Sequence, residues 1–181
     1  MEGYAQLMGG QKVFTEKLQM VFDEGLYDPA NEPDIAYAYL FSRFKGEEWR
    51  TQKLIPQLLR EYFTTKPDGI PGNDDTGTMS AWAVFSMMGF YPDCPGEPSY
   101  TLTAPTFEKV TITLDPKWYN GHNELVISKS GSNENGREAK RDSYDRISGM
   151  TLGRKTLKGY RISHEELTRG GELVFRCRAG K

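Results

Sequence analysis

The spacing of apolar residues changes near residue 92, and this change limits what the chain can fold into. Before that point, apolar residues recur every three to four positions, which predicts amphipathic helices. After it, apolar and polar residues alternate, which is typical of half-buried strands. A segment rich in proline and glycine, residues 92–98, separates the two patterns. The sequence therefore predicts an α+β fold, with helices over residues 1–92 and an antiparallel, β-sandwich-like part over residues 93–181.

Apolar spacing predicts four helices in the first part. They are expected at residues 13–22, 35–40, 49–62 and 78–88. Asp34 is placed to cap the second helix, and Pro56 is expected to kink or restart the third because it lacks a backbone donor. The fourth should end at Gly89, and its lack of charged residues predicts burial on all sides.

In the second part, alternation predicts strands separated by turns and one long loop. The strands are expected at residues 110–114, 125–127, 157–162 and 172–177. The polar stretch at residues 130–145 is expected to be a surface loop.

Composition excludes several classes of protein. The 23 basic and 25 acidic residues give a net charge of −2, with no basic stripe for nucleic acid or anionic membranes. The longest apolar stretch, residues 80–90, is too short to cross a bilayer, and the first residues do not open a signal peptide. Cys94 and Cys177 lack metal-ligand spacing and are expected to be unpaired thiols.

The densest cluster of functional side chains lies in residues 67–77, directly before the fourth helix. Asp74 and Asp75 stand beside Asn73 in a glycine-rich loop. Adjacent carboxylates and an amide suit acid–base work, recognition of sugar hydroxyls or binding of a hard cation. The alternative is a turn that caps the helix, since Asp and Asn favour both positions.

A second polar cluster, Asn31-Glu32-Pro33-Asp34, precedes the second helix. Taken alone it can be a capped helix start. Both clusters stand where a loop enters a helix, so a helical array could present them on the same rim.

Other candidate residues are less specific. His122 and His164 are far apart in sequence, so a metal or triad role is not expected. Trp82 and Tyr91 are expected in the core or a pocket wall, and Trp49 and Trp118 to be partly exposed. Each of these aromatic rings could stack on a sugar.

A series of motifs resembles the C-terminal part of glycoside hydrolase family 92. In order, they are NEPDIA at 31–36, AYLF at 38–41, WRTQK at 49–53, GIPGNDDTGTMSAW at 69–82, GFYP at 89–92, ISHEEL at 162–167 and GGELVF at 170–175. The order and the spacing are similar to those of the family, and the resemblance runs from about residue 10 to the end.

The resemblance implies part of an (α/α)6 barrel joined to β-sandwich structure. It also implies an inverting, calcium-dependent exo-α-mannosidase, mostly bacterial, that releases mannose from glycans such as N-glycans, with α-1,2-linkage expected here. Asp74 and Asp75 match the general-base segment. Asn31, Glu32 and Asn73 are implied to bind the sugar, and Asn31, Glu32 and Asp75 the calcium ion.

Three differences from the family pattern shape the functional hypothesis. Thr78 stands where the family commonly has Gln, and Asp34-Ile35-Ala36 replaces the family's frequent His-bearing continuation of the Asn-Glu-Pro triplet. In addition, no counterpart of the family's general-acid Glu precedes Asn31. The chain is therefore expected to be a C-terminal fragment that is inactive alone and needs the rest of a periplasmic or secreted catalytic domain. The alternative is a non-catalytic carbohydrate-binding or scaffolding module of the same fold.

Overall fold

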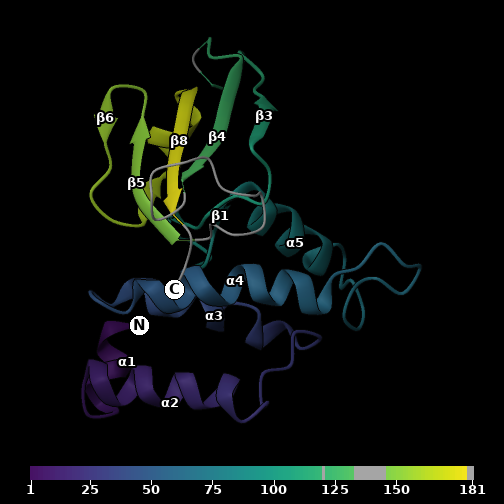
Figure 1. Ribbon diagram of the computed structural model, residues 1–181, viewed down its shortest axis with the longest axis vertical. Helices are drawn as coiled ribbons and strands as arrows, with labels where there is room; N and C mark the ends of the chain where they lie inside the picture. Colours follow the sequence, from purple (N-terminus) through teal and green to yellow (C-terminus); the bar gives the residue numbers. More distant parts are fainter. Residues whose placement is uncertain (120, 133–145, 179–181) are drawn as a thin grey trace. The chain divides into compact units, whose positions relative to one another are not determined.

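A computed structural model describes residues 1–119, 121–132 and 146–178 of the chain (Figure 1). The chain divides into two compact units, Met1–Ala83 and Val84–Lys181. The division falls inside helix α5, Thr78–Met88. The domain boundary expected after residue 92 stays a prediction.

Unit 1 is helical, as the apolar spacing predicted. Its elements are α1 (Glu2–Leu7), α2 (Gln11–Asp23), the 3-10 turn η1 (Glu32–Asp34), α3 (Tyr37–Leu40), η2 (Phe41–Arg43), α4 (Glu48–Tyr62) and the first part of α5. The predicted helices at 13–22 and 49–62 are confirmed, and α5 has the predicted bounds. The second helix is only one turn of α-helix between two 3-10 turns.

Three local predictions about these helices are wrong. Asp34 does not cap α3, because the helix begins three residues later and its own N-cap is Ala36. Helix α4 runs past Pro56 without restarting, since buried leucines on both sides of the proline favour continuation of the helix, while the alternative of a kink at Pro56 stays a prediction. Helix α5 is not buried all round, because Val84 is 54% exposed: the absence of charge does not require burial.

Aromatic rings dominate the interior of unit 1. Phe14 packs on Phe44 with ring centroids 5.1 Å apart. The indole of Trp82 is 1% exposed and stacks on Phe63 at 5.4 Å. This interior fixes the start of α5, which the candidate loop at residues 67–77 enters.

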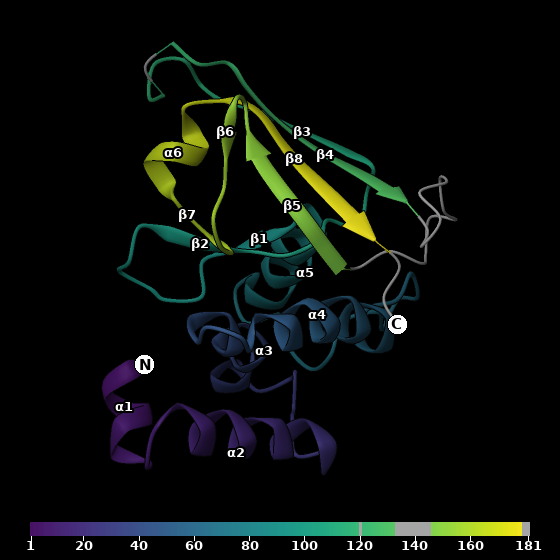
Figure 2. The ribbon, with the colours of Figure 1, turned by 60° about the vertical axis from the view of Figure 1, so that its left-hand side comes forward.

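The described residues of unit 2 form two sheets, one short helix and the last part of α5 (Figure 2). Its strands are β1 (Phe90–Tyr91), β2 (Ser99–Leu102), β3 (Lys109–Thr113), β4 (Glu124–Ser132), β5 (Arg146–Leu152), β6 (Lys155–Thr156), β7 (Arg161–Ser163) and β8 (Gly171–Arg178), and its helix is α6 (His164–Thr168). The strand orders are β1-β2-β7 and β3-β4-β8-β5-β6. All pairs are antiparallel except β4 with β8, which are parallel. The α+β fold class is thus confirmed.

The strand predictions are confirmed in part. β3, β4 and β8 lie where alternation placed them. The predicted strand at 157–162 is wrong in part, because strand structure there begins at Arg161. The predicted loop at 130–145 is wrong for its first three residues, which extend β4, and residues 133–145 lie outside the described residues.

Apolar side chains of both sheets form one core in unit 2, which includes Leu102, Ile127, Leu173 and Phe175. Cys94 and Cys177 are not joined in a disulfide, as predicted. Among the helices of the described residues, none combines the length and hydrophobicity of a membrane span.

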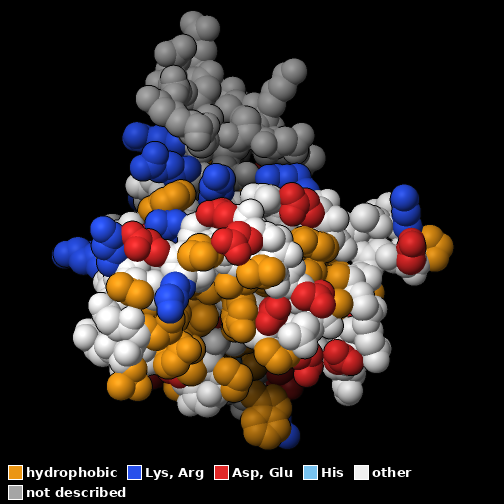
Figure 3. Space-filling model, turned by 90° about the horizontal axis from the view of Figure 1, so that it is seen from below, with side chains coloured by type: hydrophobic (Ala, Val, Ile, Leu, Met, Phe, Trp, Pro, Cys, Tyr) orange, Lys and Arg blue, Asp and Glu red, His pale blue; other side chains and the backbone are white. Residues whose placement is uncertain are grey.

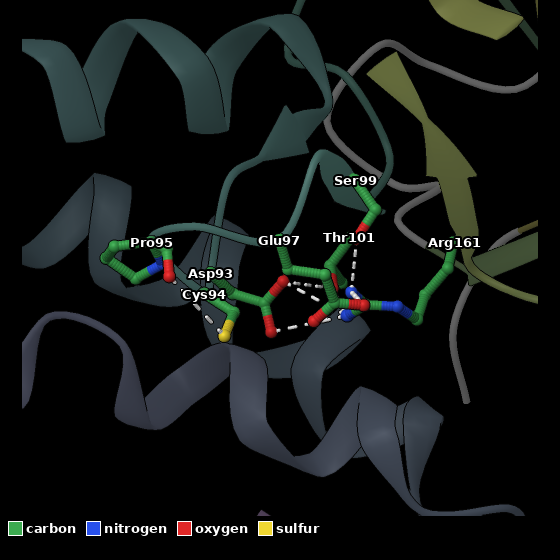
Figure 4. Close-up of polar contacts among 7 residues, drawn as sticks. All are labelled: Asp93, Cys94, Pro95, Glu97, Ser99, Thr101 and Arg161. Atoms are coloured by element: carbon green, nitrogen blue, oxygen red, sulfur yellow. Dashed lines mark hydrogen bonds and ion pairs between the residues drawn. The ribbon is translucent and has the colours of Figure 1, made fainter. Parts of the chain in front are cut away.

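The segment between α5 and β2 is held by a buried ion pair (Figure 4). The Asp93 carboxylate is fully buried and lies 3.1 Å from the guanidinium of Arg161, while the Thr101 hydroxyl donates to it at 3.0 Å. Arg161 also donates to Glu97 at 2.8 Å. As predicted, residues 92–98 form neither helix nor strand, but Arg161 fastens them to β2 and β7.

Candidate active site

The two polar clusters lie on neighbouring loops of unit 1. A Cβ atom placed on Gly72 would lie 2.6 Å from the Cβ of Ala30, so the loop at 67–77 touches the residue before Asn31. The indole of Trp82 donates a hydrogen bond to the backbone carbonyl of Ile35 at 2.9 Å. The loop at 67–77 and the helix after it therefore contact the first cluster at two points, one before Asn31 and one after Asp34.

Asp34 organises the first loop. Its carboxylate accepts hydrogen bonds from the backbone N–H of Asp28 at 3.2 Å and from the side-chain amide of Asn31 at 3.4 Å. Burial raises the pKa of Tyr37, and the neighbouring charge and hydrogen bond of Asp34 raise it further. With its amide nitrogen directed to Asp34, Asn31 keeps its side-chain oxygen as an acceptor, and the adjacent Glu32 is exposed.

Close backbone approach shapes the second loop. The backbone N–H of Thr64 donates to the carbonyl of Gly69 at 2.8 Å. A Cβ on Gly69 would lie 2.2 Å from the Thr64 carbonyl oxygen, so no larger residue fits. Gly72 has a φ of +64° where it meets Ala30. The loop therefore requires glycine at the points where it closes and where it touches its neighbour.

Both carboxylate oxygens of Asp74 accept hydrogen bonds from Ser80. One accepts from the backbone N–H of Ser80 at 2.8 Å and the other from the Ser80 hydroxyl at 2.9 Å. Asp74 thus satisfies a free donor in the first turn of α5. Ser80 is exposed and its hydroxyl holds this aspartate.

Asp75 differs from Asp74 in both backbone and side chain. Asp75 and Thr76 have φ values of 46° and 61°, a left-handed conformation that is costly for a β-branched threonine. The Asp75 carbonyl accepts from the backbone N–H and the hydroxyl of Thr78, at 3.2 and 2.8 Å. Within the part of the chain that the structure describes, the Asp75 carboxylate has no hydrogen-bond or ion-pair partner.

The structure brings the backbones of the two clusters together but does not join their side chains. Among the described residues, no hydrogen bond links Asn31 or Glu32 to Asn73, Asp74 or Asp75. Asn73 is exposed. The side chains of Glu32, Asn73 and Asp75 are therefore accessible polar groups on adjoining loops, which is the arrangement that binding of a polar ligand requires.

The residues expected to bind calcium supply the right atoms in too small a number. Asn31, Glu32 and Asp75 offer oxygen ligands, which calcium prefers, but the ion takes six to eight of them. In the described ranges, no group of three or more His, Cys, Asp or Glu side chains is placed to hold a metal ion. These residues fit part of a calcium shell, and the remaining ligands would have to come from other groups.

Sequence reasoning did not connect His122 and His164, which are 42 positions apart in the chain. The structure places both at one pocket of unit 2, together with Trp118. Trp118 is 71% exposed and Trp49 52%, as predicted for both.

Comparison with known proteins extends over nearly all of the chain. The sequence pattern described as "Glycosyl hydrolase family 92 catalytic domain" matches residues 1–179. A protein of Arthroderma benhamiae named "Uncharacterized secreted glycosidase" is 33% identical over 106 residues, which are 59% of this chain and 14% of the fungal protein.

Two solved structures from Bacteroides thetaiotaomicron are similar in fold. The family GH92 α-mannosidase BT3965 superposes with a TM-score of 0.80 at 26% identity, over 95% of this chain and 22% of its own. The family GH92 inverting mannosidase BT2199 gives a TM-score of 0.78 at 28% identity, over 97% of this chain and 25% of its own. The chain thus spans about a quarter or less of these relatives. Its motifs, its fold and the match over residues 1–179 show that it belongs to glycosyl hydrolase family 92.

Proposed function

We propose that this chain carries the general base and part of the sugar-binding site of an inverting exo-α-mannosidase that acts on α-1,2-linked mannose. Membership of a glycoside hydrolase family supports hydrolysis of a glycosidic bond. The two Bacteroides relatives, an α-mannosidase and an inverting mannosidase, support mannose as the sugar and inversion as the stereochemical course.

One observation carries the assignment of the base. Both oxygens of Asp74 are engaged by Ser80, whereas Asp75 has no partner for its carboxylate among the described residues. A general base needs a carboxylate oxygen that can accept a proton from water. We therefore assign the base to Asp75 and a positioning role to Asp74, which fixes the turn that presents its neighbour.

The proposed reaction is a single displacement. The Asp75 carboxylate accepts a proton from a water molecule as the water oxygen bonds to the anomeric carbon. The bond between that carbon and the glycosidic oxygen breaks, and a general acid protonates the leaving oxygen on the opposite face. Because no such acid is identified in this chain, we propose that it comes from another part of the catalytic domain.

The neighbouring polar groups suit the remaining roles. Asn31, Glu32 and Asn73 present carboxylate and amide groups that can hydrogen-bond sugar hydroxyls. Asn31, Glu32 and Asp75 would supply part of the oxygen shell of a calcium ion, with other ligands from outside these three residues. When bound, the ion would polarise sugar hydroxyls and offset the negative charge of the loop.

An exposed apolar face supports the proposal that unit 1 packs against more of the catalytic domain. Figure 3 shows hydrophobic side chains gathered on the side where α1 and α2 lie in Figure 1. On these two helices, Tyr4, Leu7 and Met20 are 56%, 88% and 49% exposed. Large exposed apolar patches commonly mark contact surfaces. The proposed occupant is the remainder of the parent catalytic domain.

Export is part of the same proposal. The fungal relative is named a secreted glycosidase, which supports export of the enzyme. The chain would then act as part of a secreted or periplasmic enzyme.

The proposal is tested by assaying this chain and a full-length protein that contains it on α-1,2-mannobiose, with and without a calcium chelator. We expect turnover by the full-length protein, loss of turnover with chelator, and almost none by the 181-residue chain. Turnover by the short chain at the full-length rate would overturn the fragment proposal. Absence of turnover together with sugar binding by the full-length protein would favour the alternative, a non-catalytic carbohydrate-binding module.

A further inference from the structure

Unit 2 contains a pocket of about 200 Å³ that the proposed reaction does not use. Its lining includes Trp118, Tyr119, His122, His164, Glu165 and Arg169. We call it the α6 pocket, because three of these residues lie on or directly after helix α6 (Figure 2). The other three precede strand β4.

Two segments far apart in sequence are held together to form this pocket. Gly170 has a φ of +76°, and a Cβ atom there would lie 2.7 Å from the Glu124 carbonyl oxygen and 3.3 Å from the Cβ of His122. Leu167 of α6 is in the core of unit 2, and Tyr119 packs against that core. The walls are therefore anchored in the interior of the unit.

Polar groups at the pocket contact one another or a neighbouring side chain. The Tyr100 hydroxyl lies 2.8 Å from Nδ1 of His164, which leaves Nε2 as the other polar atom of that ring. Arg169 donates to the Glu165 carboxylate at 2.6 Å. The pocket thus offers a cation, a carboxylate and an imidazole close together, with balanced charge.

An exposed aromatic ring stands at the same pocket. Trp118 is 71% exposed although it is the largest apolar side chain there. The ammonium group of Lys117 lies 4.9 Å from the centroid of its ring, which is a cation–π distance. An exposed indole beside hydrogen-bonding groups has one apolar face to offer a ligand.

We propose that the α6 pocket binds a single neutral hexopyranose unit. A pyranose has an apolar C–H face that packs on an aromatic ring and an edge of hydroxyls that both donate and accept. Arg169 supplies hydrogen-bond donors and Glu165 supplies acceptors, and sugar hydroxyls can use both. A phosphate group would fit less well, because the Glu165 carboxylate repels an anion. The volume suits one sugar ring, below the range for drug-sized ligands. The described residues hold no group of three metal-ligating side chains here, so a metal ion is not the proposed ligand.

The test is a titration of the full 181-residue chain with methyl α-D-mannopyranoside, followed by tryptophan fluorescence and calorimetry. We expect saturable binding with a dissociation constant on the order of millimolar. Trp118→Ala should weaken binding at least about tenfold, and Tyr100→Phe should weaken it less, because it frees His164 without removing the aromatic face.

Trp49→Ala is the matched control. Trp49 is also exposed, at 52%, and also has a cation, Arg50, 4.9 Å from its ring centroid. It should leave sugar binding unchanged. Trp118→Ala leaves Asn31, Glu32, Asn73 and Asp75 intact, so any binding that survives it belongs to the proposed active site, and the two sites are tested separately.

Three results would overturn this proposal. They are no saturable binding of the methyl mannoside, binding that Trp118→Ala leaves intact, and competition by inorganic phosphate at concentrations below those of the sugar.

Discussion

The Trp82 side chain donates its indole N–H to the backbone carbonyl of Ile35 at 2.9 Å. Trp82 lies on α5, which follows the loop that carries Asp74 and Asp75, and Ile35 directly follows the turn that carries Glu32. The ring is held by Phe63 on one side and by the edge of Tyr39 at 6.2 Å. One buried side chain thereby connects the two halves of the candidate site.

Trp82→Phe should therefore destabilise unit 1. The substitution keeps an aromatic ring but leaves the Ile35 carbonyl without its donor and opens a small cavity, at a cost of about 2–4 kcal/mol. Chemical denaturation followed by circular dichroism measures the change. Trp49→Phe, on the surface, should cost less than about 0.5 kcal/mol, and equal losses from the two variants would contradict the role given to Trp82.

Gly72→Ala should separate the two loops. The new methyl group would meet the Cβ of Ala30 at 2.6 Å, and the positive φ adds strain, so we expect a loss of about 2 kcal/mol or more. Gly25→Ala is the control: its φ is +67° and the space around it is open, so it reports backbone strain alone. Ala30→Gly should restore part of the stability lost by Gly72→Ala. The contact assignment would be wrong if Gly25→Ala cost as much, or if Ala30→Gly gave no relief.

The amino-acid sequence predicted the long, strongly periodic elements well. Helix α5 was predicted with its observed bounds because its apolar run ends at Gly89, and β8 because its alternation is regular. The direction of the β4–β8 pair was not predictable, since alternation does not distinguish parallel from antiparallel neighbours. Asp34 was misassigned because its partners, Asp28 and Asn31, lie before it rather than in the following helix.

Helix α6 was missed although the sequence holds a signal for it. The Ser163 hydroxyl accepts from the backbone N–H of Glu166 at 3.1 Å, which is half of a capping box, and Ser-x-x-Glu is the corresponding motif. The separate roles of Asp74 and Asp75 in the candidate loop could not be predicted from the sequence. That Asp74 is engaged by Ser80 while Asp75 is not depends on backbone geometry at Asp75 and Thr76, which composition does not reveal.

Breaking the Asp93–Arg161 pair should destabilise unit 2. Arg161→Met removes the guanidinium that lies 3.1 Å from the fully buried Asp93 carboxylate, at a cost of about 3 kcal/mol or more. Arg169→Met removes an arginine that is 63% exposed from its pair with Glu165, and should cost less than about 1 kcal/mol. Thermal unfolding of the three proteins measures both. A small effect of Arg161→Met would contradict the view that this pair fastens residues 92–98.

Glu166 should make the stability of unit 2 depend on acid pH. Hydrogen bonds from the side chain of Lys155 and from the backbone and side chain of Ser163 lower the pKa of Glu166 from its usual value of 4.5. A carboxyl group whose pKa is lowered by folding stabilises the fold while it is ionised. This contribution is present above about pH 4.5 and is lost as the pH falls through the lowered pKa.

Glu166→Gln should therefore destabilise the protein slightly at neutral pH, and the difference from wild type should shrink below pH 4.5. Urea denaturation across this range measures it. Glu16→Gln, which removes a carboxylate from the exposed Lys12 pair, controls for the change in net charge. A difference between Glu166→Gln and wild type that stays constant with pH would refute the assignment.

The assignment of the general base is tested most directly by the hydrolysis of α-1,2-mannobiose by the full-length protein and its Asp75→Asn and Asp74→Asn variants, with the first-formed anomer of mannose recorded by proton NMR. We predict release of β-mannose, a fall in kcat of about 10²–10⁴-fold for Asp75→Asn, and a smaller fall for Asp74→Asn, which keeps one acceptor for Ser80. Release of α-mannose, or a larger loss from Asp74→Asn than from Asp75→Asn, would contradict this account.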